Sequence, residues 1–165
     1  MTTGTVVGAG ETPRLDAHLL KFSQVWTFGL AALAFVLQLP WLVAVAAACL
    51  LISAAVPALS PFRLLYRFVA LSTRLIRPRI VEDDPAPHRF AQGVGATFLV
   101  ASTLVLFLAP AAFVAGWTLD LIVFALSLIN FSVGFCAGCF VYYHLGRVGL
   151  MPRVRYAGSF HWRGV

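Results

Sequence analysis

The chain has 165 residues, of which 61% are hydrophobic and only 11% are charged. Soluble domains carry about 45–50% apolar and about 25% charged residues, so the composition excludes an ordinary soluble domain and predicts one compact membrane unit. Twelve basic residues against six acidic ones give a net charge of +6. The basic residues lie between apolar segments rather than on one folded face, which indicates membrane topology and not nucleic-acid binding.

The N-terminal third of the chain predicts a helical hairpin. A transmembrane helix needs about 20 apolar residues, and the apolar stretch over residues 22–56 is too long for one span. It is interrupted at Gln38-Leu-Pro-Trp41, and proline favours the first turn of a helix over its interior. We therefore expect a cytoplasmic N-terminal segment over residues 1–20, followed by spans over about residues 21–38 and about residues 40–58.

The connection to the third span predicts an amphipathic helix over about residues 61–77. Ser60 is a suitable cap, Pro61 a suitable first residue, and Pro78 a suitable end. On a helix, the arginines fall on one stripe opposite a broad apolar face; they are Arg63, Arg67, Arg74 and Arg77. A helix of this kind lies in the membrane interface and attracts anionic lipid head groups.

Two further spans complete the predicted fold. Asp84 is a suitable N-cap and Pro85 a suitable first residue, so a third span is expected over about residues 86–109. The fourth is expected as one long helix over about residues 117–144, within a membrane domain of residues 21–147 and before a cytoplasmic tail of residues 148–165. The predicted fold class is an all-α bundle of four transmembrane helices with an interfacial helix between spans two and three.

The basic residues also predict the orientation. Every Lys and Arg lies before the first span, between the second and third spans or at the start of the third, or after the fourth. The positive-inside rule makes this side cytoplasmic. We therefore expect a multi-pass protein of the cytoplasmic membrane with both termini in the cytoplasm and the lipid bilayer as its first partner.

Cys136 and Cys139 form the candidate catalytic site, a CxxC pair with potential redox activity. On a continuous helix their β-carbons would lie about 5–6 Å apart, which permits a disulfide. Cys49 would lie roughly 15–20 Å away in membrane depth and is expected to be a small buried residue. The pair would stand in the last third of the fourth span, where the negative helix end and the apolar surroundings both disfavour a thiolate.

Four polar side chains are expected to support the pair from the same depth: His88, Arg89, Gln92 and His144. A cation beside Cys139 would favour its thiolate, and two histidines with two cysteines could hold zinc or copper(I). The spacing matches no standard zinc motif, so no metal site is predicted. Interfacial anchoring, or contact with Asp83 and Asp84, is the more ordinary role for His88 and Arg89.

The two faces of the fourth span predict how it packs. At about 100° per residue, Asn130, Gly134 and Gly138 share one face, and the cysteines lie nearly opposite. Small residues allow close helix approach, and a membrane asparagine needs a partner. We expect the glycine–asparagine face inside the bundle and the cysteine edge at the periphery, where a partner protein can reach it.

Three stretches together resemble a known family: Arg14–Phe22, DPAPHRFAQ over residues 84–92, and GFCAGC over residues 134–139. They resemble small bacterial integral membrane proteins catalogued only as a domain of unknown function, and the likeness covers roughly residues 14–147. The family is similar in context to thioredoxin- or rhodanese-associated membrane proteins. The resemblance thus implies sulfur or redox chemistry with such a partner, and it assigns no role to any residue.

Two classes of function are compatible with the sequence. The first is a thiol-redox or sulfur-handling component that uses Cys136 and Cys139, with quinone-linked thiol oxidation as its most concrete mechanism. The second is a non-catalytic structural or assembly subunit of a membrane complex, and a small-solute transporter is a weaker third. No cofactor is predicted, because no motif supports a quinone or a metal. The absence of an acid, histidine or lysine at mid-membrane argues against proton-coupled transport.

Overall fold

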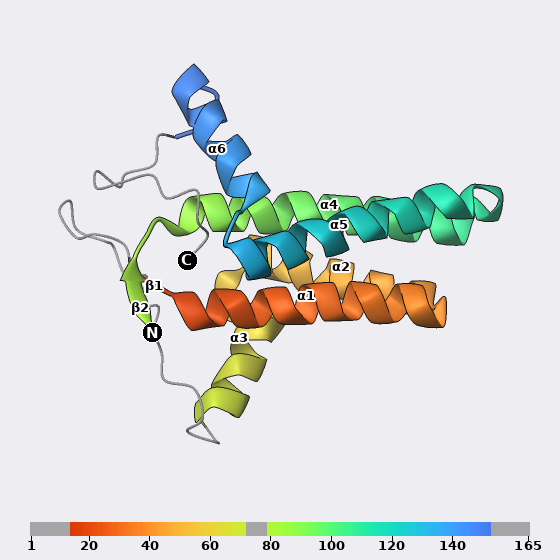
Figure 1. The fold of residues 1–165 in the computed structure, drawn as a ribbon, viewed down its shortest axis with the longest axis horizontal. Coiled ribbons are helices and arrows are strands. Elements are labelled where there is room, and N and C mark those ends of the chain that lie inside the picture. Colours follow the sequence, from red (N-terminus) through yellow and green to blue (C-terminus); the bar gives the residue numbers. More distant parts are fainter. Residues whose placement is uncertain (1–13, 72–78, 153–165) are drawn as a thin grey trace.

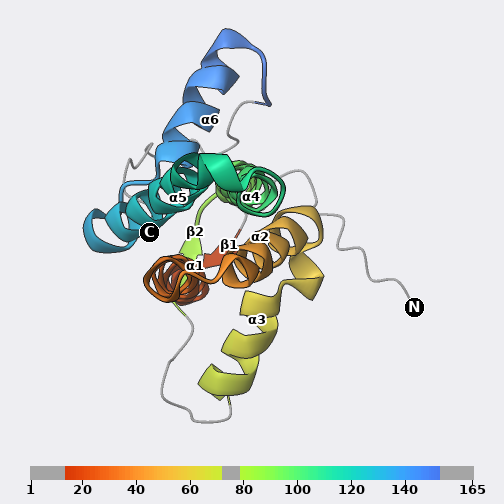
Figure 2. The same ribbon diagram turned by 90° about the vertical axis from the view of Figure 1, so that its right-hand side faces the viewer.

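Four antiparallel helices form the body of the molecule. The structure, a computed structural model, describes residues 14–71 and 79–152. In the bundle, each long helix packs against two others (Figure 1, Figure 2). These helices are α1 (Ala17–Leu37), α2 (Pro40–Ala55), α4 (Pro85–Leu108) and α5 (Phe113–Val133). The described part of the chain is therefore essentially all-α, as expected.

Most of the shorter elements lie near one end of this bundle, and the 3-10 turn that joins α4 and α5 lies at the other end (Figure 1). Helices α3 (Pro61–Tyr66) and α6 (Ala137–Val148) leave the bundle on opposite sides, and both begin near the end where the two strands lie (Figure 1). The remaining short pieces are 3-10 turns over Pro57–Leu59 and Pro110–Ala112 and a π-helical turn over Arg67–Leu71.

Three segments are long and apolar enough to cross a membrane: Ala17–Leu37, Pro85–Leu108 and Pro110–Val133. Helix α2 is apolar but has only 16 residues, which corresponds to about 24 Å against a hydrocarbon core of about 30 Å. Large apolar side chains such as Leu33, Val45 and Leu104 are exposed on the outside of the bundle. This surface is compatible with a multi-pass membrane protein.

Small side chains build much of the interior. Ala31, Ala34, Ala46 and Ala96 are each at most 1% exposed. Alanines at helix interfaces let the backbones approach closely, and close packing is what holds helices together in lipid. Leu99 and Val43 are the largest fully buried apolar residues. The bundle is therefore held by close helix contact rather than by a thick layer of large side chains.

The helix starts follow the capping residues. Pro40 occupies the first turn of α2, and Pro85 that of α4. The Asp84 side chain accepts a hydrogen bond from the Ala86 N–H at 2.9 Å, and the Asp16 side chain accepts one from the His18 N–H at 3.0 Å. Both carboxylates satisfy amides that a helix start leaves unpaired.

A two-stranded ladder, which the sequence did not predict, ties the two halves of the chain together. Strand β1 (Arg14–Asp16) pairs antiparallel with β2 (Ile80–Glu82), with Leu15 opposite Val81. The Ala17 N–H also donates to the Arg79 carbonyl oxygen at 2.9 Å. The start of α1 is thereby fixed to the segment that leads into α4.

The expected continuous helix over residues 117–144 is wrong. Helix α5 ends at Val133, and Gly134 adopts a left-handed φ of 73° while its N–H donates to the Asn130 carbonyl oxygen at 3.0 Å. Helix α6 then begins at Ala137 and leaves the bundle at a steep angle to α5 (Figure 1). Glycine is the residue that accepts this conformation at a helix end without a steric penalty.

The helix predicted over residues 61–77 is observed in part. Residues 61–66 are α-helical and Arg67–Leu71 form the π-helical turn, while Arg74 and Arg77 lie outside the described residues. Phe62 and Tyr66 are buried against the bundle, and Phe68 is exposed.

Candidate functional site

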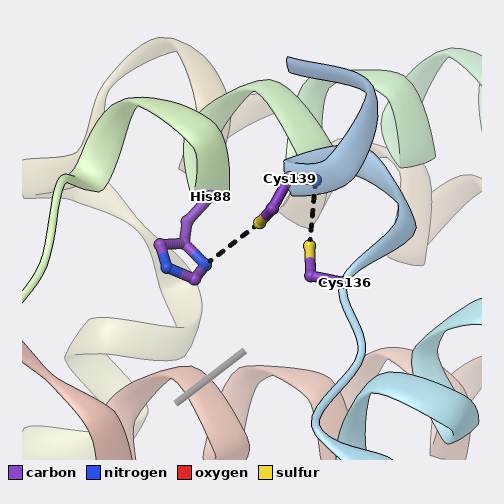
Figure 3. A group of neighbouring side chains, drawn as sticks. All are labelled: His88, Cys136 and Cys139. Atoms are coloured by element: carbon purple, nitrogen blue, oxygen red, sulfur yellow. Dashed lines mark hydrogen bonds between the residues drawn. The ribbon is translucent and has the colours of Figure 1, made fainter. Parts of the chain in front are cut away.

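The two cysteines stand at the N-terminus of α6, not near the end of a longer helix. Cys136 is the N-cap residue, and its Sγ accepts a hydrogen bond from the Cys139 N–H at 3.3 Å (Figure 3). The N-terminus is the positive end of a helix and stabilises a thiolate. The expectation that the helix end disfavours a thiolate is therefore wrong, because the helix restarts after Gly134.

His88 extends the cysteine pair into a chain of hydrogen bonds. Its Nδ1 lies 3.7 Å from the Cys139 Sγ (Figure 3), and its Nε2 lies 3.0 Å from Oδ2 of Asp83. A carboxylate oxygen only accepts, so Nε2 donates to Asp83 and Nδ1 faces the Cys139 sulfur, whose one proton can be donated either to Nδ1 or to Cys136. The order of contacts is Asp83, His88, Cys139, Cys136.

The arrangement separates the acidities of the two thiols. The hydrogen bond from the Cys139 thiol, supported by the Cys139 N–H and by His88, lowers the pKa of Cys136 to about 7 despite its burial. The same thiol–thiol interaction, together with burial, raises the pKa of Cys139. The pair therefore ionises at Cys136, while Cys139 keeps its proton next to the His88 ring.

The two cysteines also differ in solvent exposure. Cys136 is 4% exposed, and Cys139 is partly exposed. The expectation of a peripheral cysteine edge is therefore wrong for Cys136, which lines an internal cavity. Gly138 packs inward as expected, since a β-carbon placed on it would lie 2.5 Å from the Ala91 Cβ of α4.

The other three residues expected to support the cysteine pair do not contact it directly in the way that His88 does. Arg89 donates to the carbonyl oxygens of Ala54 and Ala55 at 3.0 and 3.4 Å, so it caps the C-terminus of α2 rather than joining the cysteines. His144 is exposed further along α6, with its ring 4.4 Å from that of Phe140. Gln92 lines the cavity beside His88.

The cavity lies between α1, α4, α5 and the first residues of α6, and its volume is about 120 Å³. Its polar lining comes from three helices: Ser23, Gln24, Thr27, Gln92, Ser127 and Asn130. No ligand pocket was predicted from the sequence. Three polar residues of α1 within two turns were an available signal, but the facing helices could not be placed around them.

His88 and the two cysteines also have the donor atoms of a metal site. The His88 ring nitrogen and the two sulfur atoms all lie within 4.8 Å of one another. One imidazole and two thiolates suit zinc or copper(I). The second histidine of the set considered from the sequence, His144, is not a member of this group.

Comparison with known proteins gives one match. A family model described as Domain of unknown function (DUF4395) matches residues 15–147, most of the chain. No curated protein and no solved structure matches the chain.

Proposed function

The chain belongs to the family described as a domain of unknown function (DUF4395), and on that premise we propose that it is a membrane thiol–disulfide oxidoreductase. The observation that carries the proposal is the placement of the Cys136 sulfur at the N-terminus of α6, with His88 against Cys139. A thiolate stabilised in this way is the feature that reactive CxxC pairs share.

The membrane topology belongs to the same proposal. We infer four spans, with α2 as a short one, and α3 and α6 lying in the interface. The described basic residues belong to β1, the starts of α1 and α4, the segments beside β2 and the short helices, all toward one end of the bundle (Figure 1). This placement supports a cytoplasmic position for that end and for both termini.

Exchange begins at Cys139, because it is the more exposed sulfur. A thiolate of a partner dithiol attacks the Cys139 sulfur of the Cys136–Cys139 disulfide. The new bond joins the partner to Cys139, and the electron pair of the broken bond leaves on Cys136. A leaving thiol of low pKa departs faster, which is the property that the helix N-terminus gives to Cys136.

The second thiolate of the partner completes the reaction. It attacks the partner's own sulfur in the mixed disulfide, forms the partner disulfide and releases Cys139 as a thiolate. His88, 3.7 Å away, is placed to deliver a proton to that sulfur when its ring is protonated. The net change is one disulfide reduced here and one dithiol oxidised on the partner. A thioredoxin- or rhodanese-like protein carries thiols suited to this exchange.

Thiol trapping in intact cells tests the proposal. Wild-type protein should show a fraction in which Cys136 and Cys139 are oxidised together. The Cys136→Ser variant should accumulate a mixed disulfide through Cys139, because no second thiol resolves it, and Cys139→Ser should not. Cys49→Ser is the matched control and should behave as wild type. A pair that stays reduced, and whose loss has no effect, would instead support a non-catalytic subunit of a membrane complex.

A soft-metal site is the second candidate function, and the three donor atoms within 4.8 Å favour it. Protein purified without oxygen would then carry about one zinc or copper ion per chain. The metal would protect both thiols from alkylation, and His88→Ala would lower the metal content. Metal-free protein with freely alkylated thiols would exclude this function and leave the redox proposal.

A further inference from the structure

Two residues that line the cavity next to Cys136 have a buried amide oxygen without a hydrogen-bond partner among the described residues. These atoms are Oε1 of Gln24 on α1 and Oδ1 of Asn130 on α5. The neighbouring hydroxyls do not compensate, since Ser23 donates to the Leu20 carbonyl oxygen and Thr27 to that of Ser23. A buried polar atom without a partner is costly. Two such residues in the lining of one cavity indicate a polar occupant.

The lining restricts the charge of that occupant. The cavity is lined by no Lys, Arg, Asp or Glu among the described residues, and its titratable groups are His88 and Cys136. An anion such as a sulfur oxyanion would lose its hydration there without gaining a fixed positive charge. The ligand is therefore neutral and hydrogen-bonding.

The size of the cavity restricts the ligand further. A cavity of about 150 Å³ in another protein accommodates benzene, and the volume here is about 120 Å³. The cavity is thus slightly smaller than one that holds an unsubstituted six-membered ring, so a substituted ring would extend into its open side. Leu126 lines the cavity and is also 43% exposed on the outside of α5. The cavity is partly open, and an apolar tail attached to the ring could leave beside Leu126.

We propose that the cavity binds the ring of a membrane quinone, which oxidises the Cys136–Cys139 dithiol. This inference rests on the proposed thiol–disulfide function and names its electron acceptor. An amide both donates and accepts hydrogen bonds. Gln24 and Asn130 can therefore donate to the carbonyl oxygens of a quinone and accept from the hydroxyls of the hydroquinone, so one site serves both redox states.

The reaction balances as a two-electron transfer. The Cys136 thiolate adds to a ring carbon and forms a carbon–sulfur bond. Cys139 gives its proton to His88, and its thiolate attacks the Cys136 sulfur. The disulfide forms, the carbon–sulfur bond breaks, and its electron pair stays on the ring. Two protons complete the hydroquinone, so one dithiol and one quinone become one disulfide and one hydroquinone.

The test uses full-length reduced protein in detergent without oxygen and decylubiquinone as the probe. One quinone should be consumed for each disulfide formed. Gln24→Leu and Asn130→Leu should each slow the reaction about tenfold, because each removes one hydrogen bond to the ring. Thr118→Val removes a hydroxyl from an exposed position of α5 and is the matched control, for which the rate should not change.

Diamide, which oxidises thiols directly, separates the two proposals. Disulfide formation with diamide but not with quinone would overturn the quinone site and leave the thiol–disulfide function intact. Failure with both oxidants would overturn both. Equal quinone rates in all variants would show that the quinone reacts outside the cavity.

A photolabelling measurement tests quinone binding directly, without the leucine variants, in case these fold poorly. In the Cys136→Ser/Cys139→Ser protein, an azido-labelled short-chain quinone should label peptides of α1 and α5 on illumination, and decylubiquinone should compete. Labelling confined to other helices would overturn the site without any reference to thiol chemistry.

Discussion

Replacing Gly138 by alanine tests whether the contact between α4 and α6 positions the thiols. The new β-carbon would lie 2.5 Å from the Ala91 Cβ and 2.7 Å from the Ala91 Cα, whereas non-bonded carbons prefer about 3.5–4.0 Å. Helix α6 must therefore retreat from α4 by about 1 Å. Because His88 is on α4, the distance of 3.7 Å between its Nδ1 and the Cys139 Sγ would grow to about 4.7 Å, too long for a hydrogen bond.

The expected effects follow from this displacement. Overpacking costs about 1–3 kcal/mol, and the helix propensity of alanine returns up to about 1 kcal/mol, so unfolding in detergent should become easier by up to about 2 kcal/mol. Disulfide exchange through Cys139 should slow about tenfold as the contact with His88 is lost. The pKa of Cys136 should stay near 7, since its largest cause lies within the pair.

Two comparisons make the result decisive. Gly93→Ala on α4 adds a β-carbon at an ordinary 3.9 Å from the Ala54 Cβ and should leave exchange unchanged. In a His88→Ala background, Gly138→Ala should slow exchange no further, because the contact it breaks is already absent. Unchanged stability and unchanged exchange for Gly138→Ala would refute the close packing of α6 on α4.

Three further predictions concern charge and burial. The alkylation rate of Cys136 should titrate with a midpoint near pH 7. Folding lowers this pKa from 9.0 to about 7, so a stabilisation of about 2–3 kcal/mol is gained between pH 7 and pH 9 and is lost as the pH falls to 7, which denaturation at several pH values measures. Above pH 9 the raised pKa of Cys139 acts in the opposite direction and lowers stability again. Arg89→Gln should lower stability by about 0.5–1 kcal/mol through the lost cap on α2 and leave thiol alkylation unchanged. Asp120 is 0% exposed, and its carboxyl oxygens have no hydrogen-bond partner among the described residues. Asp120→Leu should therefore raise the free energy of unfolding in detergent by about 1–3 kcal/mol. A loss of stability would show that this carboxyl has a partner in the folded protein.

The sequence predicted best what depends on local chemistry. Pro40 and Asp84 begin their helices because a proline or a capping carboxylate acts within its own turn. Family membership was also predicted correctly from three short stretches. Apolar length predicted four spans, and three segments of the structure are long and apolar enough to cross a membrane. Hydropathy is a sum that needs no knowledge of neighbouring helices.

The sequence predictions failed for features that depend on the conformation of one residue or on a very short segment. A single left-handed glycine ends α5, yet Gly134 lies in a stretch whose apolar character continues on both sides. The prediction of one continuous helix through Gly134 therefore placed the cysteines at the wrong end of a helix and on the wrong face. The β1–β2 ladder joins segments 64 or more residues apart with only three residues each, which is too short to show an alternating pattern.

The break at Gly134 also explains why the two thiols differ. In a continuous helix, Cys136 and Cys139 would have their amides bonded to carbonyls one turn earlier, and neither sulfur could accept an N–H at a free helix start. The restart at Ala137 leaves the Cys139 N–H free to bond the Cys136 sulfur and turns that sulfur toward the cavity, while Cys139 faces His88. Electrons would then enter through the more exposed Cys139 and leave through the buried Cys136. Gly134→Ala, which penalises the left-handed turn by about 1–2 kcal/mol, should therefore reduce the difference in reactivity between the two thiols, as the alkylation rate of each thiol in the protein that keeps both cysteines would measure. An unchanged difference would show that the thiols are distinguished by something other than the break in the helix.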